Sequence, residues 1–292
     1  MPAYFIPYSW LSYFTLTEDR IDHRNPNAFQ FPTIITLLEK AGRTYFYDTF
    51  TALNFQSPFR LDGERLDAVV NDIKESSKDL YLVYIDALDV YGHCYGPDSL
   101  EFREVLQQLD RDLKQFTELL ESVAPGNRYL FLGDHGMVTV TNRIDAEKEI
   151  SRLLHSVGLR KGYDVIYFLD STMIRFWALT DKARSLLTNT ITSSEIFNEN
   201  GSWMDKQTAK SNHVSWPDRR YGDHLWIANP GVLVFPDFFH RYSPCKGMHG
   251  YDPKLPESRG MCIHWGEGIY PSVHPVIPLT KIFNLLKINM NL

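Results

Sequence analysis

The chain has 292 residues, which is long enough to bury one sizeable core, with or without an inserted subdomain. A hydrophobic fraction of 43% and a charged fraction of 23% are typical of a soluble globular protein. The net charge is −6 and no cluster of Lys and Arg stands out, so we expect no binding along a nucleic-acid backbone, although a small phosphate ester held by a metal is compatible with this charge.

Nothing in the sequence indicates export or membrane insertion. No apolar stretch approaches the roughly 20 residues that cross a bilayer. The N-terminal MPAYFIPYSWLSYF lacks a basic region and contains proline, so it is a poor signal peptide. The three cysteines, Cys94, Cys245 and Cys262, are too few and too scattered for a disulfide framework or a thiolate zinc site. The sequence therefore predicts a cytoplasmic protein without a membrane segment.

The first part of the chain alternates between helical and strand patterns. Residues 31–48 predict a helix that closes near Gly42 and is followed by a short strand. The apolar spacing of 66–76 predicts a second helix, and the apolar run LYLVYI at 80–85 predicts a buried strand.

The segment DVYGHCYGPDS at 89–99 follows that strand and has two interpretations. Its Gly and Pro residues are typical of a turn, in which Asp and His are readily accommodated. Alternatively, Asp89 and His93 are metal ligands. The segment alone leaves both interpretations open.

Residues 100–123 predict a long helix, because their apolar positions recur mostly at steps of three and four. Residues 129–136 predict a short strand that ends in polar residues and Gly. Strand, helix and strand in this order favour an α/β fold with a mostly parallel sheet flanked by helices. Ligands of such sheets gather at the carboxyl ends of the strands, so we expect the polar residues after both strands at one edge.

Five residues with metal-binding side chains stand at such places. Asp89 and His93 follow one strand, Asp134 and His135 follow another, and His249 lies between two glycines in GMHGYD. Each histidine alone is more often structural than functional. Together they favour a metal site, because mixed carboxylate and imidazole ligands suit Zn²⁺ and, less specifically, other first-row metals.

The second part of the chain continues the alternation. We expect a strand pair, or a strand and turn, at 164–179, a helix at 181–191 and a polar loop at 200–224. Two strands separated by a Pro-Gly turn are expected at 225–239, and a closing amphipathic helix at 276–289.

The motifs resemble those of a known family. D-x-x-G-H-x-x-G-P-x-S from Asp89, D-H-G-M from Asp134 and G-M-H-G-Y-D around His249 are similar, in order and spacing, to the type I phosphodiesterase/nucleotide pyrophosphatase group of the alkaline phosphatase superfamily. The resemblance is clear over about 85–140 and 220–260 and looser elsewhere. It implies an alkaline-phosphatase-like fold and a zinc-dependent hydrolase of small phosphate esters, including nucleotides.

The resemblance also implies a site with two zinc ions. Asp89, His93 and His249 resemble the ligands of one ion, and Asp134 and His135 resemble two ligands of the other. In the family, an aspartate on the first strand of the sheet completes the second set, and a Thr or Ser nucleophile follows it.

That first-strand segment has no clear match in this chain. The nearest candidate, YFYDTFTALN with Asp48, Thr49 and Thr51, is better interpreted as a strand and loop in the middle of the family's core. We therefore expect the chain to lack its nucleophile, as an N-terminally truncated member of the family would. A phosphonoacetate- or phosphomonoester-type hydrolase and an inactive truncated paralogue are the alternatives.

The domain prediction follows the same resemblance. Residues 1–150 and 225–292 are expected to form the metal-binding α/β core, and 151–224 a small inserted α+β subdomain that covers the active site. The candidate substrate contacts of this insert, with a purely structural strand as the alternative, are Asp170, Ser171, Thr172 and Arg175. Arg175 is a candidate anion contact because its guanidinium fork matches a phosphate.

Overall fold

The structure is a computed structural model that describes residues 32–48, 61–212, 214, 219, 221–270, 272–273 and 276–292, without the side chain of Asp48. Internal contacts divide the chain into two compact units. Unit 1 contains Val90–Arg103 and His135–Gly260, and unit 2 contains the described residues up to Asp89 together with Glu104–Asp134 and Met261–Leu292. The predicted core and insert, divided at 150/151 and 224/225, are a different division and stay a prediction.

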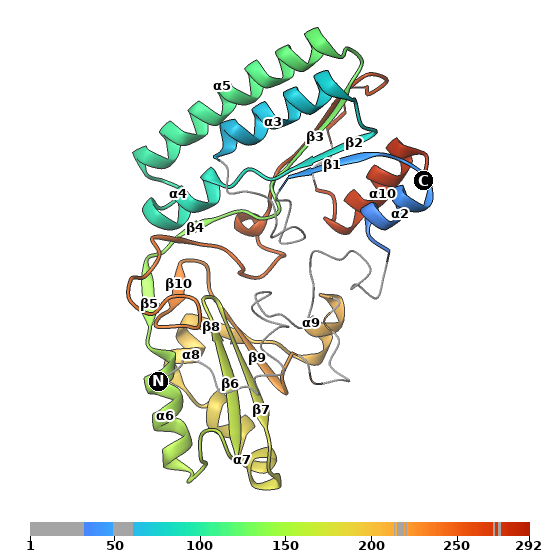
Figure 1. Cartoon of the computed structure of the whole chain (residues 1–292). Coiled ribbons are helices and arrows are strands. Elements are labelled where there is room, and N and C mark those ends of the chain that lie inside the picture. The colour runs from blue at the N-terminus through green and yellow to red at the C-terminus, as the bar shows by residue number, and fades with distance from the viewer. Residues whose placement is uncertain are drawn as a thin grey trace. The chain divides into compact units, whose positions relative to one another are not determined.

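Unit 2 contains helices packed on short strand pairs. Its elements are α2 Ile34–Lys40, β1 Tyr45–Asp48, α3 Asp62–Glu75, β2 Leu80–Val83, most of α5 Leu100–Val123, β3 Arg128–Leu132, β12 Cys262–Gly266 and α10 Thr280–Met290. Strands β1 and β2 pair in parallel, and β3 and β12 pair antiparallel. Helices α3 and α5 lie side by side and meet β3 through Val70, Leu120 and Tyr129 (Figure 1). The helices and strands predicted for this part of the chain are confirmed.

Unit 1 is built around a four-stranded antiparallel sheet in the order β6-β7-β9-β8. Its elements are β4 Val138–Thr139, β5 Asn142–Ile144, α6 Ala146–Ser156, β6 Val165–Asp170, β7 Met173–Ala178, α7 Asp181–Thr192, α8 Glu195–Asn200, β8 Gly201–Trp203, α9 Lys206–Ser211, β9 His224–Ala228, β10 Val232–Val234, β11 Gly247–Met248 and the 3-10 helix η2 Pro256–Ser258. Strands β5 and β10 pair in parallel, and β4 and β11 pair antiparallel. The predicted strand pair at 164–179 and the helix at 181–191 are confirmed. The two strands predicted at 225–239 appear as β9 and β10, which lie in different sheets.

The main core of unit 1 lies around the β6–β7 hairpin. Strand β6 has the sequence VIYFLD, and its first five residues are all buried, which is the pattern of a strand covered on both faces. Helices α6, α7 and α8 contribute Ile150, Leu187 and Phe197 to the same cluster, and all three side chains are fully buried (Figure 1). The hairpin is therefore a rigid support for the loops that leave it.

The predicted loop at 200–224 is partly wrong. Its first residues form strand β8, which pairs with β9, and helix α9 follows. The ring of Trp203 packs 5.9 Å from the ring of Phe176 and 5.9 Å from that of Phe197, measured between centroids. Tertiary packing of this one indole against the core thus orders a segment whose local composition is typical of a loop.

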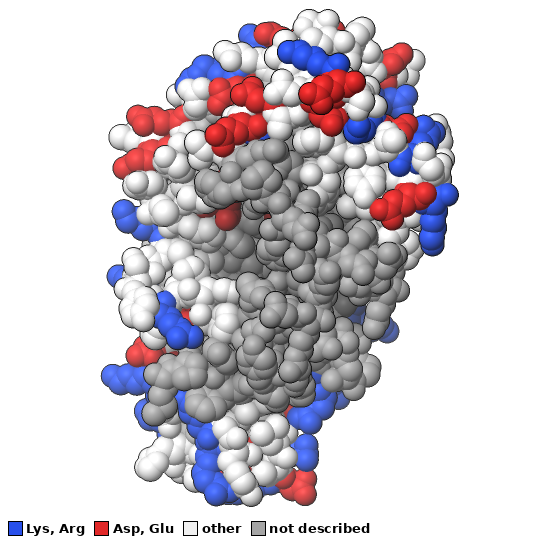
Figure 2. Space-filling view, in the orientation of Figure 1, with Lys and Arg blue, Asp and Glu red and all other residues white. Residues whose placement is uncertain are grey.

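The described surface carries charges of both signs. On the face shown in Figure 2, Lys and Arg side chains lie among Asp and Glu side chains over the described part of the chain. None of the described helices combines the length and the apolar character that crossing a bilayer requires. The cellular compartment stays a prediction.

Candidate metal centre

Asp89 and His93 lie on helix α4, which spans Ala87–Tyr95. Of the two interpretations of 89–99, a turn does not describe its first residues, because they belong to this helix as far as Tyr95. Residues four apart on a helix share one face, so both side chains point the same way. The spacing of the motif D-x-x-G-H is therefore the spacing of one helical turn.

Gly92 and Gly247 let this helix approach the segment that carries His249. A Cβ atom on Gly247 would lie 2.4 Å from the carbonyl oxygen of Gly92, which is closer than any side chain allows. Two hydrogen bonds bridge the same approach. The amide of Lys246 donates to the carbonyl of His93 at 2.8 Å, and Nδ1 of His93 donates to the carbonyl of Gly247 at 2.9 Å.

The hydrogen bond to Gly247 also defines the chemistry of His93. A carbonyl oxygen only accepts, so Nδ1 of His93 carries the proton and Nε2 holds the lone pair. This is the usual arrangement for a metal-ligating histidine, in which the outer nitrogen donates to a backbone carbonyl. His135 has the same arrangement, because its Nδ1 lies 3.0 Å from the carbonyl of Gly136.

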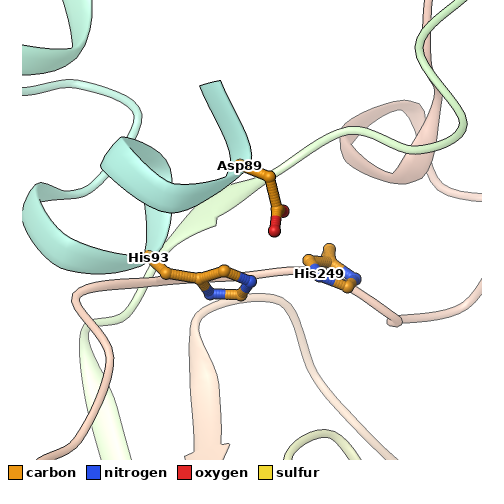
Figure 3. Close-up of side chains that lie close together, drawn as sticks. All are labelled: Asp89, His93 and His249. Atoms are coloured by element: carbon orange, nitrogen blue, oxygen red, sulfur yellow. The ribbon is translucent and has the colours of Figure 1, made fainter. Parts of the chain in front are cut away.

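Asp89, His93 and His249 form a group whose candidate ligand atoms all lie within 4.8 Å of one another. Figure 3 shows the carboxylate of Asp89 directed toward the two imidazole rings. All three side chains are half-buried. One carboxylate and two imidazoles form a donor set that suits zinc and other first-row divalent metals, so the residues fit the metal that the sequence predicts.

Asp134 and His135 follow strand β3, as predicted. The ring of His135 stacks on that of His249, with 3.7 Å between their centroids. Within the described ranges, neither Asp134 nor His135 belongs to a group of three or more metal-binding side chains, so their role as ligands of a second ion stays a prediction.

Tyr84, just beyond the end of β2, lies near two of the predicted carboxylate ligands. Burial, and then the negative charges of Asp89 and Asp134, raise the pKa of its phenol. Tyr84 therefore keeps its proton and is uncharged at neutral pH.

A second polar group, which was not predicted from the sequence, lies next to His93. Asp237 is fully buried, and its carboxylate accepts hydrogen bonds from the backbone amide of His240 at 2.5 Å and from Nδ1 of that residue at 3.2 Å. Burial alone raises the pKa of the Cys245 thiol, but hydrogen bonds with His240 and His93 bring it down to about 7. The sequence does contain a signal for this polar group. Asp237, His240 and Cys245 lie within nine residues of one another, shortly before the GMHG motif.

The predicted substrate contacts of the insert lie at the β6–β7 turn. Arg175 is buried in β7, with Nη2 at 3.7 Å from a carboxylate oxygen of Asp170. The hydroxyl of Thr172 donates to the carbonyl of Gly250 at 2.9 Å, and Oγ of Ser171 lies 3.3 Å from Nδ1 of His240. Thr172 thus holds the residue after His249, whereas substrate binding by Arg175 stays a prediction.

The candidate nucleophiles cannot be placed. Thr49 and Thr51 lie outside the described residues, as does the side chain of Asp48. A nucleophile for this site stays unassigned in the part of the chain that the structure describes.

Comparisons with known proteins agree with these motifs and this fold. An uncharacterized pyrophosphatase/phosphodiesterase of Schizosaccharomyces pombe is 27% identical over 231 residues, which cover 73% of this chain and 44% of that protein. An inactive variant of murine ectonucleotide pyrophosphatase/phosphodiesterase 5, in complex with AMP, matches with a TM-score of 0.70 and 17% identity over 92% of this chain and 73% of the other. Phosphonoacetate hydrolase from Sinorhizobium meliloti 1021, in complex with phosphonoformate, matches with a TM-score of 0.63 and 15% identity over 99% and 79%.

The fold is therefore the predicted α/β fold of the alkaline phosphatase superfamily. The chain spans less than half of the length of the curated relatives that it matches. The family model for type I phosphodiesterase / nucleotide pyrophosphatase matches residues 8–252, which is most of the chain. On this match, together with the three motifs, the chain belongs to the type I phosphodiesterase/nucleotide pyrophosphatase family.

Proposed function

We propose that this chain binds a divalent metal ion, with zinc preferred, at Asp89, His93 and His249, and that it acts as a hydrolase of phosphate diesters or pyrophosphates. The observation that carries the proposal is the convergence of one carboxylate and two imidazoles within 4.8 Å. Membership of the phosphodiesterase family supports it independently of that geometry.

A second ion at Asp134 and His135 completes the proposal. The stacking of His135 on His249 supports it, because it brings a residue of the second set against a residue of the first. When bound, divalent ions neutralise charge on phosphoryl oxygens and stabilise the transition state of displacement at phosphorus.

The chain's own residues orient these groups. Gly247 holds the ring of His93 in the tautomer that leaves Nε2 as the lone-pair donor. No described residue is assigned as the nucleophile, and the absence of a nucleophile from this chain stays a prediction.

Nucleotides are the substrate class that we favour. The support is the AMP bound to murine ectonucleotide pyrophosphatase/phosphodiesterase 5, a protein with the same fold. A phosphonoacetate-type hydrolase is the second candidate, because the enzyme of that name also shares the fold over 99% of this chain.

The test is hydrolysis by the purified chain in zinc of three substrates: bis-p-nitrophenyl phosphate, p-nitrophenyl phosphate and phosphonoacetate. We expect the diester to be preferred, and Asp89→Asn to lose bound metal and more than about 100-fold of the activity. The matched control is Asp98→Asn, since Asp98 lies just beyond the same helix and accepts a hydrogen bond from Thr139.

Three other outcomes have defined meanings. Preference for phosphonoacetate or for the monoester would replace the substrate class and keep the metal centre. Bound metal without turnover would identify an inactive member of the family. Metal content that is equal in the wild type and Asp89→Asn would contradict the metal centre itself.

A further inference from the structure

Helix α4, which carries Asp89 and His93, begins at a cluster of charged side chains around one buried arginine. Arg65, from the first turn of α3, is 2% exposed. Its Nη1 donates to the carbonyl oxygen of Tyr84 at 2.9 Å and to Oδ1 of Asp62 at 3.2 Å, and its Nη2 donates to Oδ2 of Asp86 at 3.1 Å. One guanidinium thus joins the start of α3 to the junction between β2 and α4.

Asp62 completes the junction by capping α4 from another helix. Its Oδ1 accepts from the amide of Asp86 at 3.2 Å, and its Oδ2 accepts from the amide of Ala87 at 3.1 Å. The first amides of a helix have no carbonyl partner within it, and a carboxylate near them is favourable both as an acceptor and as a charge. Asp86 stands at the N-cap position, but its own carboxylate is paired with Arg65.

The three carboxylates of Asp62, Asp86 and Asp89 have different binding partners. Asp62 binds backbone amides and Asp86 binds the guanidinium, whereas Asp89, the third residue of α4, belongs to the metal-binding group. The place where α4 starts and the direction of its first turn decide where the Asp89 carboxylate lies. Because His93 is one turn further along the same helix, it follows the same constraint.

We propose that Asp62 and Arg65 are positioning residues of the metal centre, which hold the start of α4 so that Asp89 reaches the two imidazoles. The inference rests on the proposed function, since it concerns the same metal group. Partners that orient metal ligands commonly change metal affinity by about 10- to 100-fold when they are removed. We expect a change of that size for Asp62→Asn and Arg65→Gln.

The variants separate the two roles of the cluster. Asp62→Asn keeps the shape but replaces one acceptor oxygen with an amide donor, which meets the amide of Ala87 or Asp86 as donor against donor. Arg65→Lys keeps the charge but cannot span three acceptors, so we expect it to fall between the wild type and Arg65→Gln. Arg43→Gln is the matched control, because Arg43 pairs with Asp79 at 2.8 Å in the same unit, with both side chains substantially exposed.

The experiment measures two independent quantities on the full chain. The first is Co²⁺ affinity and the visible absorption spectrum of the Co²⁺-loaded protein, which reports ligand geometry and not stability alone. The second is amide hydrogen exchange in the metal-free protein, where loss of a helix cap should speed exchange in the first turn of α4 about five- to tenfold. We expect both changes in Asp62→Asn and Arg65→Gln and neither in Arg43→Gln.

The outcomes distinguish this inference from the proposed function. A wild-type chain that binds no Co²⁺ would refute the metal centre, and faster exchange confined to α4 in Asp62→Asn would still support the positioning of that helix. Co²⁺ affinity within twofold of the wild type, with exchange in α4 unchanged, would overturn the inference. Faster exchange throughout, with β6–β7 peptides affected as much as α4, would also overturn it, since it would reveal a general loss of stability.

Discussion

The two units of this molecule differ in the physical interactions that hold their elements in place. In unit 1, the loops that lead to His249 rest on an apolar core in which whole strands are buried. In unit 2, the described core cluster around Val70, Leu120 and Tyr129 is small, and the helix that carries Asp89 starts on hydrogen-bonded charges. An apolar core loses stability when the volume of a side chain changes, whereas a charged network loses stability when one of its hydrogen-bond partners is removed.

The largest expected effect tests the difference between the two cores. Leu169 in β6 is fully buried, whereas Leu82 in β2 is 8% exposed. We expect Leu169→Ala to lower the free energy of unfolding by about 4–5 kcal/mol and Leu82→Ala by about 2–3 kcal/mol. Urea denaturation of both variants measures the two losses, and equal losses would remove the contrast between the units.

A smaller effect concerns the support of His249. Thr172→Val removes the hydroxyl that donates to Gly250, at a cost of about 1–2 kcal/mol in the free energy of unfolding, and it should also weaken Co²⁺ binding. Thr190→Val is matched, because the Thr190 hydroxyl is buried and donates to the carbonyl of Leu186 at 2.8 Å. We expect similar stability for both variants and weaker metal binding for Thr172→Val alone. Equal metal affinities would show that the β6–β7 turn does not position His249.

The smallest effect is a dependence of stability on pH within unit 1. The hydrogen bond to Asp237, and then the one with Cys245, raise the pKa of His240 from 6.5 to about 10. A group whose pKa is raised on folding stabilises the fold fully below its unfolded pKa, and this contribution is lost as the pH rises from 6.5 toward 10.

Thermal unfolding of the metal-free protein between pH 6 and 10 measures this loss. We expect the Tm of the wild type to fall by several degrees more than that of His240→Gln over that range. A parallel decline of both proteins would mean that His240 does not carry the dependence.

The sequence predicts much of the fold where apolar periodicity is strong. The helix at 100–123 and the strand pair at 164–179 appear as α5 and as the β6–β7 hairpin, because their patterns agree with their final burial. The helix over the first residues of 89–99 was not predicted, because the Gly and Asp residues of this segment disfavour a helix locally. The cap from Asp62, 24 residues away from the amide it binds, supplies what the local sequence lacks.

In the candidate site, too, residues in local motifs were predicted and residues that act through distant contacts were not. Asp89, His93 and His249 were predicted from the motifs D-x-x-G-H and G-M-H-G-Y-D, and the structure brings them together. Arg65 and Asp237 were missed, because their contribution is a contact with residues far away or a buried carboxylate without a motif. Predicting them requires knowledge of which elements meet, and a pattern within one segment does not contain it.

The close approach of α4 to the His249 segment has a consequence for tolerance to random mutation. At Gly247 any side chain would strike the backbone oxygen of Gly92 at 2.4 Å, and backbone cannot rotate away as a flexible side chain can. Gly63, in the first turn of α3, has no atom within 4 Å of the place where a Cβ would lie. Random mutation can therefore replace Gly63 more readily than Gly247, so a strict constraint beside this centre falls on a residue that contributes no chemical group.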